Sequence, residues 1–272
     1  MIRRLLAVLT CAAVLLVASS AAAHHPVSES GISWVEPVSV VELSGRASSF
    51  DFGDGFSGNW QILTLAAEWR LIEQLSLSAR VPAVHLSLDD GRRVIGLGDI
   101  EASAKYRLVA TDHGEFIASA GLGSAFPTGP VELGLGAGHF ELSPFVTLSS
   151  RPLPWLVIYG AAIDKISLGD TDAERIDERA PHGSVVSPHQ PHEMDTRLGV
   201  ALLPTDQLYS SLRVEHTVVF AGRRPGPTRA GFELGWAQRG NYRVAGGVSH
   251  PIAGTRRHLL EVHLNPALFF SH

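Results

Sequence analysis

Hydrophobic and polar residues alternate along most of the chain, from about Trp34 to Leu268. The clearest example is residues 99–108, Asp-Ile-Glu-Ala-Ser-Ala-Lys-Tyr-Arg-Leu, where even-numbered positions are apolar and odd-numbered positions are polar. Side chains of a β-strand point alternately to opposite faces. This segment therefore predicts a strand with one apolar face and one charged face.

Segments of this kind follow one another along the chain, separated by turns that contain glycine and proline. The pattern predicts strands at 34–50, 60–72, 75–88, 97–109, 115–126, 140–150, 155–167, 193–203, 208–221, 228–238, 241–250 and 256–268. Long stretches with the 3.6-residue period of a helix are absent, and an even number of strands is typical of bacterial outer-membrane barrels. We expect an all-β chain.

The lengths of the connections between these strands also alternate. Short connections at 72–74, 110–114, 151–154, 204–207 and 239–240 separate mostly longer ones, which include 51–59, 89–96, 127–139 and 164–192. Outer-membrane barrels have short periplasmic turns and longer extracellular loops. The pattern predicts an antiparallel transmembrane β-barrel of about 12 strands. A soluble secreted β-sandwich is the alternative fold, and it gives no reason for the alternation.

Aromatic residues gather near the predicted strand ends, as in the interfacial girdles of membrane barrels. The periplasmic girdle would contain Trp69, Tyr106, Phe116, Trp155, Tyr209, Trp236, Tyr242 and Phe269. The outer girdle would contain Phe50, Trp60, Phe126, Phe140 and Phe220. Tyr159 is the main exception. The alternative is that aromatic residues simply favour strands.

The first 23 residues read as a cleaved secretory signal peptide. Arg3 and Arg4 precede an apolar core at 5–17, and Ala21–Ala23 offer a small-residue cleavage site. The core is shorter than the ~20 residues of a membrane-spanning helix, which argues against a retained anchor. We expect a short N-terminal segment at 24–33, a single barrel domain at 34–272, and location in the outer membrane of a Gram-negative bacterium.

Composition narrows the expected partners. The chain has a formal charge of −5, or −7 without Arg3 and Arg4, so no nucleic-acid partner is expected. The only cysteine, Cys11, lies in the middle of the signal's apolar core, which argues against lipid attachment. The expected partners are outer-membrane lipids, the barrel-assembly machinery and a small-molecule permeant, and no cofactor is expected.

Charged residues on the polar face of the predicted strands would line the lumen, where contact with water avoids the cost of placing their charge in hydrocarbon. The candidates are Glu68, Arg70, Arg80, Glu101, Lys105, Arg107, Glu141, Arg197, Arg213, Glu215, Glu233, Arg243 and Glu261, together with Ser78, Ser143 and His263. Both signs are present, so the sequence favours neither an anion-selective nor a cation-selective pore. Opposite charges would also be able to pair across a narrow lumen.

Three stretches carry a family resemblance: Gly-Leu-Gly-Asp into Lys-Tyr-Arg-Leu within 96–108, Ser-Ala-Phe-Pro-Thr-Gly at 124–129, and the glycine-rich 133–145. They resemble the outer-membrane "MetA-pathway of phenol degradation" family, whose members are often described as transporters. The resemblance covers about half of the mature chain. It implies an outer-membrane barrel that passes small, often hydrophobic compounds, and it transfers no functional residues. The end of the chain departs from a common barrel signature, because Phe270 is followed by Ser271 and His272.

Glycines 134, 136 and 138 would either kink a strand or let a loop fold into the lumen. They do not form a phosphate cradle, because no helix is predicted after them.

Histidine is frequent, with 13 residues. His182, His189 and His192 share the longest loop with several carboxylates, a ligand set that suits zinc, copper or nickel. Their spacing matches no compact zinc motif, and solvated histidines are the alternative.

His139, Glu141 and Ser143 share one strand face, which invites comparison with lipid hydrolases. Four residues along a strand span about 13 Å, beyond hydrogen-bond reach, and no Gly-x-Ser-x-Gly motif is present. Polar lumen lining is the favoured role, and we expect no enzyme.

The favoured function is a passive channel or transporter for small molecules, constricted by Gly134–Gly138 and by the loop at 164–192. The alternatives are a metal-associated outer-membrane protein that uses the histidine-rich loop and a non-conducting structural barrel.

Overall fold

The computed structural model describes residues 35–51, 57–111, 115–168, 192–205, 207–221, 226–238, 242–254 and 258–270. The predicted signal peptide at 1–23 and the segment 24–33 lie outside the described residues. Among the described residues, no helix is long and apolar enough to cross a membrane.

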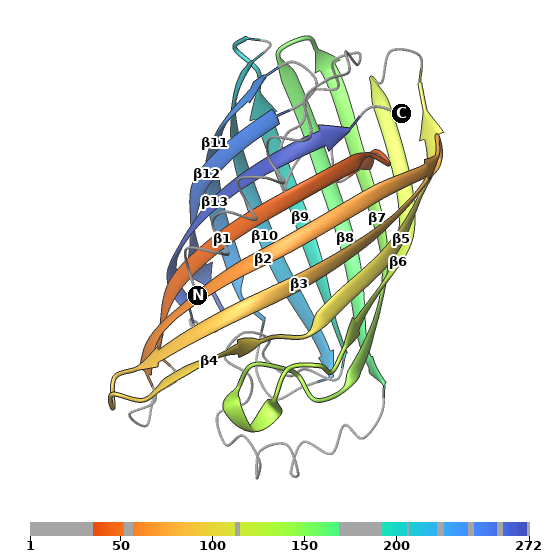
Figure 1. The fold of residues 1–272 in the computed structure, drawn as a ribbon. Helices are drawn as coiled ribbons and strands as arrows, with labels where there is room; N and C mark the ends of the chain where they lie inside the picture. Colours follow the sequence, from red (N-terminus) through yellow and green to blue (C-terminus); the bar gives the residue numbers. More distant parts are fainter. Residues whose placement is uncertain are drawn as a thin grey trace.

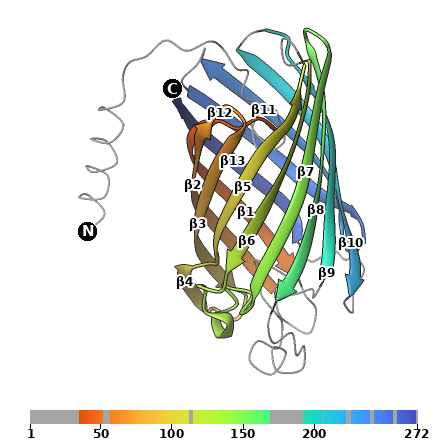
Figure 2. The same ribbon diagram turned by 90° about the vertical axis from the view of Figure 1, so that its right-hand side faces the viewer.

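The described residues form thirteen strands, of which twelve close into an antiparallel barrel and one, β4, is added at its side (Figure 1, Figure 2). The first strand pairs with the last, so the ladder closes on itself and leaves no barrel edge. The strands are β1 Ser39–Asp51, β2 Ser57–Ile72, β3 Leu75–Leu88, β4 Arg93–Leu97, β5 Ile100–Ala110, β6 Phe116–Phe126, β7 Phe140–Leu153, β8 Leu156–Leu168, β9 His192–Leu202, β10 Leu208–Ala221, β11 Thr228–Gln238, β12 Tyr242–Ala253 and β13 His258–Phe270. The predicted all-β barrel of about 12 strands is confirmed, and the β-sandwich is excluded.

The barrel wall is apolar outside and polar inside. On β2, Leu63 and Leu65 are 51% and 54% exposed on the outer surface, whereas Thr64 and Glu68 line the interior. Large exposed hydrophobic side chains occur on all twelve barrel strands of the described chain. An apolar surface of this extent suits lipid hydrocarbon rather than water.

Connections alternate in length as predicted, and the short ones lie together at one end of the barrel. They join β2 to β3, β5 to β6, β7 to β8, β9 to β10 and β11 to β12. We call this the short-turn end and the opposite one the long-loop end. β1 begins and β13 ends at the short-turn end, because Ser39 pairs with Phe270.

The longer connection predicted at 89–96 contains a further strand, β4, at Arg93–Leu97. β3 is longer than its partner β5, and the remainder of its edge, at 83–87, pairs with β4. A tight turn joins β3 to β4, with Gly91 at φ 89° and the Leu88 amide donating to Arg92 O at 2.9 Å. In this exposed turn, the hydrogen bond from the Arg92 amide, followed by that from its guanidinium, lowers the pKa of Asp90. The five residues of β4 do not alternate, because the apolar residues Val94 and Ile95 are adjacent, so the pattern gave no sign of this strand.

Four aromatic residues assigned to the girdles point into the barrel instead. Phe50 and Trp60 belong to a buried interior cluster, and the Tyr209 hydroxyl donates to buried Glu233. The Phe269 ring lies 5.5 Å from the inward guanidinium of Arg243. The position along a strand sets the height of a residue in the membrane, but only its odd or even position sets its face.

Candidate functional site

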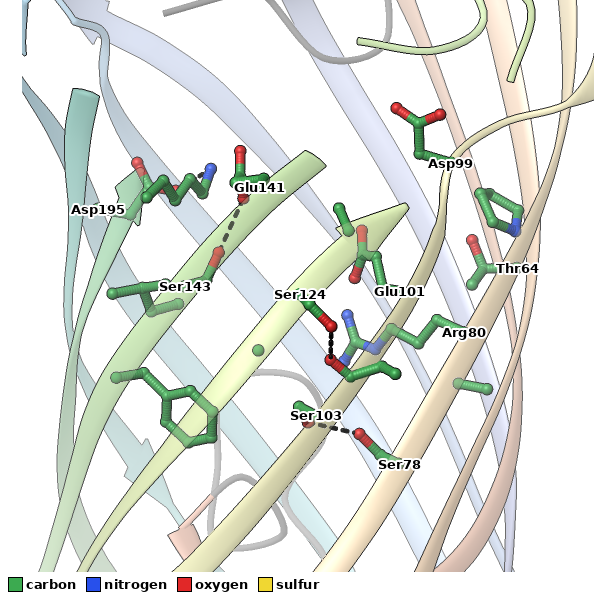
Figure 3. Close-up of a pocket in the computed structure, with 18 of the residues that line it drawn as sticks. Thr64, Ser78, Arg80, Asp99, Glu101, Ser103, Ser124, Glu141, Ser143 and Asp195 are labelled. Atoms are coloured by element: carbon green, nitrogen blue, oxygen red, sulfur yellow. Dashed lines mark hydrogen bonds and ion pairs between the residues drawn. The ribbon is translucent and has the colours of Figure 1, made fainter. Parts of the chain in front are cut away.

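A cavity of about 430 Å³ lies inside the barrel, lined mainly by inward residues of β1–β3 and β5–β9 (Figure 3). Its lining is rich in hydroxyl groups and in charges of both signs. The carboxylates are Glu42, Glu68, Asp99, Glu101, Glu141 and Asp195, and the cations are Arg46, Arg80, Lys105, Lys165 and Arg197. Six carboxylates therefore face five cations, and the lining is nearly neutral overall.

Hydroxyl groups and carboxylates form a polar surface in the middle of this cavity (Figure 3). The hydroxyl oxygens of Ser78 and Ser103 lie 2.6 Å apart across β3 and β5. Ser143 on β7 donates to Glu141 at 2.8 Å. The carboxylate of Glu101, on β5, belongs to a side chain that is exposed to the cavity.

The structure places all thirteen charged residues predicted for the lumen on the inner face of the wall. Six of them line the cavity: Glu68, Arg80, Glu101, Lys105, Glu141 and Arg197. Arg213, Glu233, Arg243 and Glu261 are buried inside the barrel, Arg107 and Glu215 form ion pairs there, and Arg70 shares the face of Glu68 on β2.

Opposite charges pair closely within the barrel. Glu215 lies 3.1 Å from Arg213 Nε and 3.6 Å from Arg197, and Arg229 lies 3.2 Å from Glu261. Arg243 is paired with Glu42, and Lys165 lies 2.8 Å from Asp195 and 3.2 Å from Glu193. Pairing of this kind offsets the cost of removing the charges from bulk water.

The side of the barrel formed by β10–β13 is filled by such groups. The Glu233 side chain is fully buried and accepts hydrogen bonds from the Tyr209 hydroxyl at 3.0 Å and from His263 Nε2, also at 3.0 Å. Arg243 is 1% exposed. A buried carboxylate is tolerated only when it is hydrogen-bonded and paired, so these residues form a solid polar wall rather than a pore surface.

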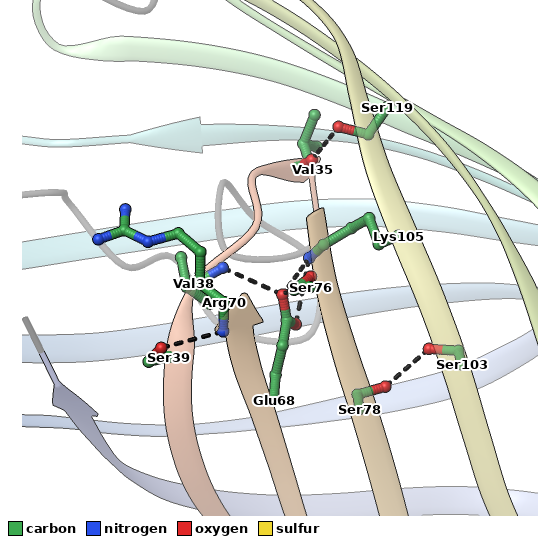
Figure 4. A network of polar contacts seen from close by, with 10 residues as sticks. All are labelled: Val35, Val38, Ser39, Glu68, Arg70, Ser76, Ser78, Ser103, Lys105 and Ser119. Atoms are coloured by element: carbon green, nitrogen blue, oxygen red, sulfur yellow. Dashed lines mark hydrogen bonds and ion pairs between the residues drawn. The ribbon is translucent and has the colours of Figure 1, made fainter. Parts of the chain in front are cut away.

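Glu68 organises the short-turn end of the cavity (Figure 4). Its carboxylate lies 2.9 Å from Lys105 Nζ and accepts from the Ser76 hydroxyl at 2.6 Å. It also accepts from the backbone amide of Val38 at 3.1 Å, so it ties the segment that precedes β1 to the barrel wall.

Residues 35–38 enter the barrel at this end. Val35 is 2% exposed, and its carbonyl accepts from the inward hydroxyl of Ser119 on β6 (Figure 4). Glu36 pairs with Arg107 on β5 at 3.1 Å. The segment therefore narrows the short-turn end of the interior from within.

The loop between β6 and β7 folds into the long-loop end. Asp99 accepts from the Gly129 amide at 2.9 Å and from the Ala137 amide at 2.6 Å, so it pins both ends of the loop. Thr128 accepts from the Ile100 amide at 2.9 Å and links the loop to β5.

Leu135 is the apolar tip of this loop. It is 1% exposed and packs into an interior cluster with aromatic and aliphatic residues of β1–β3: Phe50, Trp60, Ile62, Val84 and Leu86. Gly134 and Gly138 adopt φ of 72° and 76°, a region that favours glycine. Of the two roles considered for these glycines, the structure shows the fold into the lumen.

The three family-like motifs meet at this loop. The first contributes Asp99, the second Thr128 and Gly129, and the third residues 134–139. His139 Nε2 lies 2.8 Å from the Ser167 hydroxyl on β8 and attaches the far end of the loop. The motifs thus form one structural unit that closes part of the barrel mouth.

Of the three candidate metal ligands, His182 and His189 lie outside the described residues. His192 begins β9, and its Nε2 lies 2.8 Å from Asp164 Oδ1. Within the described parts of the chain, no group of three or more metal-ligating side chains is found.

The candidate hydrolase residues do not form a catalytic arrangement. Ser143 donates to Glu141, whereas His139 bonds to Ser167 and to the Ala137 carbonyl at 3.0 Å. Ser143 therefore has Glu141 rather than His139 as its hydrogen-bond partner, and no histidine base is in place to activate it.

Asp99, Leu135, Val35 and Glu36 are structural elements of the site that the sequence analysis did not single out. The sequence pattern indicated Asp99 as the start of a strand and Leu135 as one apolar residue of a glycine-rich loop. Their contacts join residues about 30 or more positions apart, for which alternation along the chain carries no signal.

No protein-family profile and no curated protein sequence matches the chain. Among solved structures, an outer membrane channel from Pseudomonas putida F1 is similar, with a TM-score of 0.67 and 13% identity over 90% of this chain and 99% of that one. The NanC porin has a TM-score of 0.56 and 10% identity, with 86% of this chain and 100% of that chain covered. The KdgM porin has a TM-score of 0.53 and 9% identity, with 85% of this chain and 99% of that chain covered. At these identities, the likeness establishes the fold.

Proposed function

We propose that this protein is a passive channel for small molecules in the bacterial outer membrane. The observation that carries the proposal is a polar cavity enclosed by a closed barrel with an apolar outer surface. A barrel whose backbone N–H and C=O groups bond to one another between neighbouring strands can span lipid, while its polar side chains face water inside. The outer-membrane channel and porins of similar fold support this proposal.

Two inward segments limit passage. Leu135 and its loop lie at the long-loop end, and Val35–Val38 lie at the short-turn end. The cavity lies between them. Solutes pass when thermal motion displaces these segments, and no energy source is coupled to the movement.

Liposome swelling tests the proposal. Refolded protein in liposomes is expected to admit small solutes at a rate that increases with protein content and falls with solute size. Permeability equal to that of empty liposomes, with folding verified by heat-modifiable gel mobility, would overturn the proposal.

A non-conducting structural barrel is the second candidate, and the filled wall at β10–β13 favours it. A variant that lacks residues 130–137 separates the two. A channel is expected to become more permeable without the loop, whereas a barrel closed by its ion pairs would stay impermeable.

A further inference from the structure

Strand β6 leaves an unfilled strip along the wall of the cavity. Its inward positions at mid-strand are Gly121, Gly123 and Ala125, which pair with inward residues of β5 on one side and β7 on the other. At Gly121, the ring of Phe145 occupies the free space, because an added Cβ would lie 2.2 Å from it. At Gly123, a Cβ would make only ordinary contacts, the nearest at 3.4 Å to Ser143. We call the strip at Gly123 and Ala125 the β6 trough.

In the part of the chain that the structure describes, buried polar side chains fill the opposite wall. In the order of the twelve barrel strands, β12 stands six strands from β6 in either direction. On β12 and its two neighbours, Arg243, Glu233 and His263 are each at most 3% exposed. The cavity lined by β1–β3 and β5–β9 therefore lies off the barrel axis, on the side of β6.

The strands on the two sides of the β6 trough carry both hydrogen-bond donors and acceptors (Figure 3). Ser78 and Ser103 lie on the β3–β5 side, and Ser143 bonded to Glu141 lies on the β7 side. The Glu101 carboxylate is exposed to the cavity at the same height as Glu141, because both residues pair with Ala125. Hydroxyl groups both donate and accept, and the carboxylates accept.

This chemistry selects a class of solute. A polyhydroxylated molecule exchanges its hydrogen bonds to water for bonds to hydroxyls and carboxylates, so its desolvation is compensated. An apolar molecule would leave these groups without partners. The cavity lining carries six carboxylates and five cations, so no strong field of one sign attracts simple ions.

We propose that the β6 trough is the passage for small uncharged polyhydroxylated solutes, which move along Gly123 between the hydroxyl groups of Ser78 and Ser103 on one side and of Ser143 on the other. This inference rests on the proposed channel function and names its path and substrate class. It differs from the small, often hydrophobic compounds that the motif resemblance implies.

Substituted-cysteine modification in liposomes tests the path. A chain that begins at residue 24 contains no cysteine, so Gly123→Cys introduces a single reactive thiol. A Cβ added at this position makes only ordinary contacts, so the variant is expected to fold. Attachment of a bulky methanethiosulfonate reagent to the folded protein is expected to slow arabinose-driven swelling about threefold or more.

Gly45→Cys is the matched control. Gly45 lies on the outer face of β1, where an added Cβ would have Leu264 O as its nearest neighbour at 3.9 Å. Its modification is expected to leave swelling unchanged. An equal effect of modification at both positions, or no effect at Gly123→Cys, would overturn the assigned path while leaving the channel itself in place.

The substrate class is tested with the unmodified protein. Arabinose is expected to enter faster than sodium benzenesulfonate, which carries an aromatic ring and a fixed charge. Faster entry of benzenesulfonate would overturn the class but not the channel. Failure of all solutes to enter, together with no ionic current, would instead remove the proposed function.

Discussion

At the residue scale, one carboxylate holds the loop between β6 and β7 inside the barrel. Asp99 receives two backbone amides from opposite ends of that loop, 129 and 137. Hydrogen bonds to a charged acceptor are roughly twice as strong as neutral ones. Asp99 therefore holds the loop between β6 and β7 in place at the long-loop end of the barrel.

Replacing Asp99 with alanine is expected to release the loop and widen the passage. The loss of two charge-assisted hydrogen bonds, each contributing about 1.5–3 kcal/mol, should shift the loop away from its inward position. Single-channel current in planar bilayers is expected to rise, and Asp90→Ala, in the exposed β3–β4 turn, serves as the control. The same current in all three proteins would contradict this role of Asp99.

Glu233 is expected to matter for stability rather than for passage. It is fully buried and accepts hydrogen bonds from the Tyr209 hydroxyl and from His263, and a buried polar group left without its partner typically costs about 1–3 kcal/mol. Glu233→Ala should lower the free energy of unfolding by this amount, measured by urea unfolding in lipid or detergent. Glu101→Ala, which alters a cavity-exposed carboxylate, should change it by only about 0.5 kcal/mol. Equal losses in the two variants would contradict the distinction.

At the element scale, the segment before β1 works as a second constriction. Val35 and Glu36 contact β6 and β5, and Val38 is fixed to Glu68 on β2, so this short segment crosses the interior at the short-turn end. Its contacts include the Glu36–Arg107 ion pair, the hydrogen bonds of Val35 and Val38 and the buried Val35 side chain, but residues 35–38 lie outside the strand ladder of the barrel. An element held in this way opens at lower free energy than the barrel strands.

Charge reversal tests this second constriction. Glu36→Arg places two cations together at Arg107 and is expected to raise solute flux about twofold by displacing the segment. Combining it with Arg107→Glu restores opposite charges and should return the flux toward that of the unmodified protein. Liposome swelling measures both variants. A double variant as permeable as the single one would show that the ion pair does not hold the segment.

The elements also show what alternation can and cannot predict. Ten-residue strands such as 99–108 were predictable because each exposes one whole face to lipid, and that face must be continuously apolar. β4 was not predicted because its apolar residues Val94 and Ile95 are adjacent and do not alternate with polar ones; it completes the edge of β3. Phe50 and Trp60 were misassigned because an aromatic residue near a strand end suits both a lipid girdle and an interior cluster. The pinning of the loop by Asp99 depends on contacts about 30 or more residues apart, which a local pattern does not encode.

At the scale of the whole molecule, opposite charges are distributed so that the barrel interior is close to neutral. Ion pairs fill the β10–β13 side, and the remaining space lies along β6. The molecule therefore combines a wall of buried polar groups with the proposed passage along β6. Its solute preference should depend on hydrogen bonding and size rather than on net charge.

Weak ion selectivity follows from this balance. Under a gradient of KCl across a planar bilayer, the reversal potential is expected to lie near zero, with a permeability ratio of cation to anion of about 1. Arg80→Glu adds negative charge to the cavity lining and should shift the ratio toward cations. Strong selectivity in the unmodified protein would contradict the nearly neutral lumen.

Current through the purified protein in a planar lipid bilayer decides whether this protein is a channel. The unmodified protein is expected to give discrete current steps, and deletion of residues 130–137 is expected to give larger steps, because the loop then no longer occupies the barrel mouth. A correctly folded barrel that gives no steps, with or without that loop, would contradict the proposal that this protein is a channel.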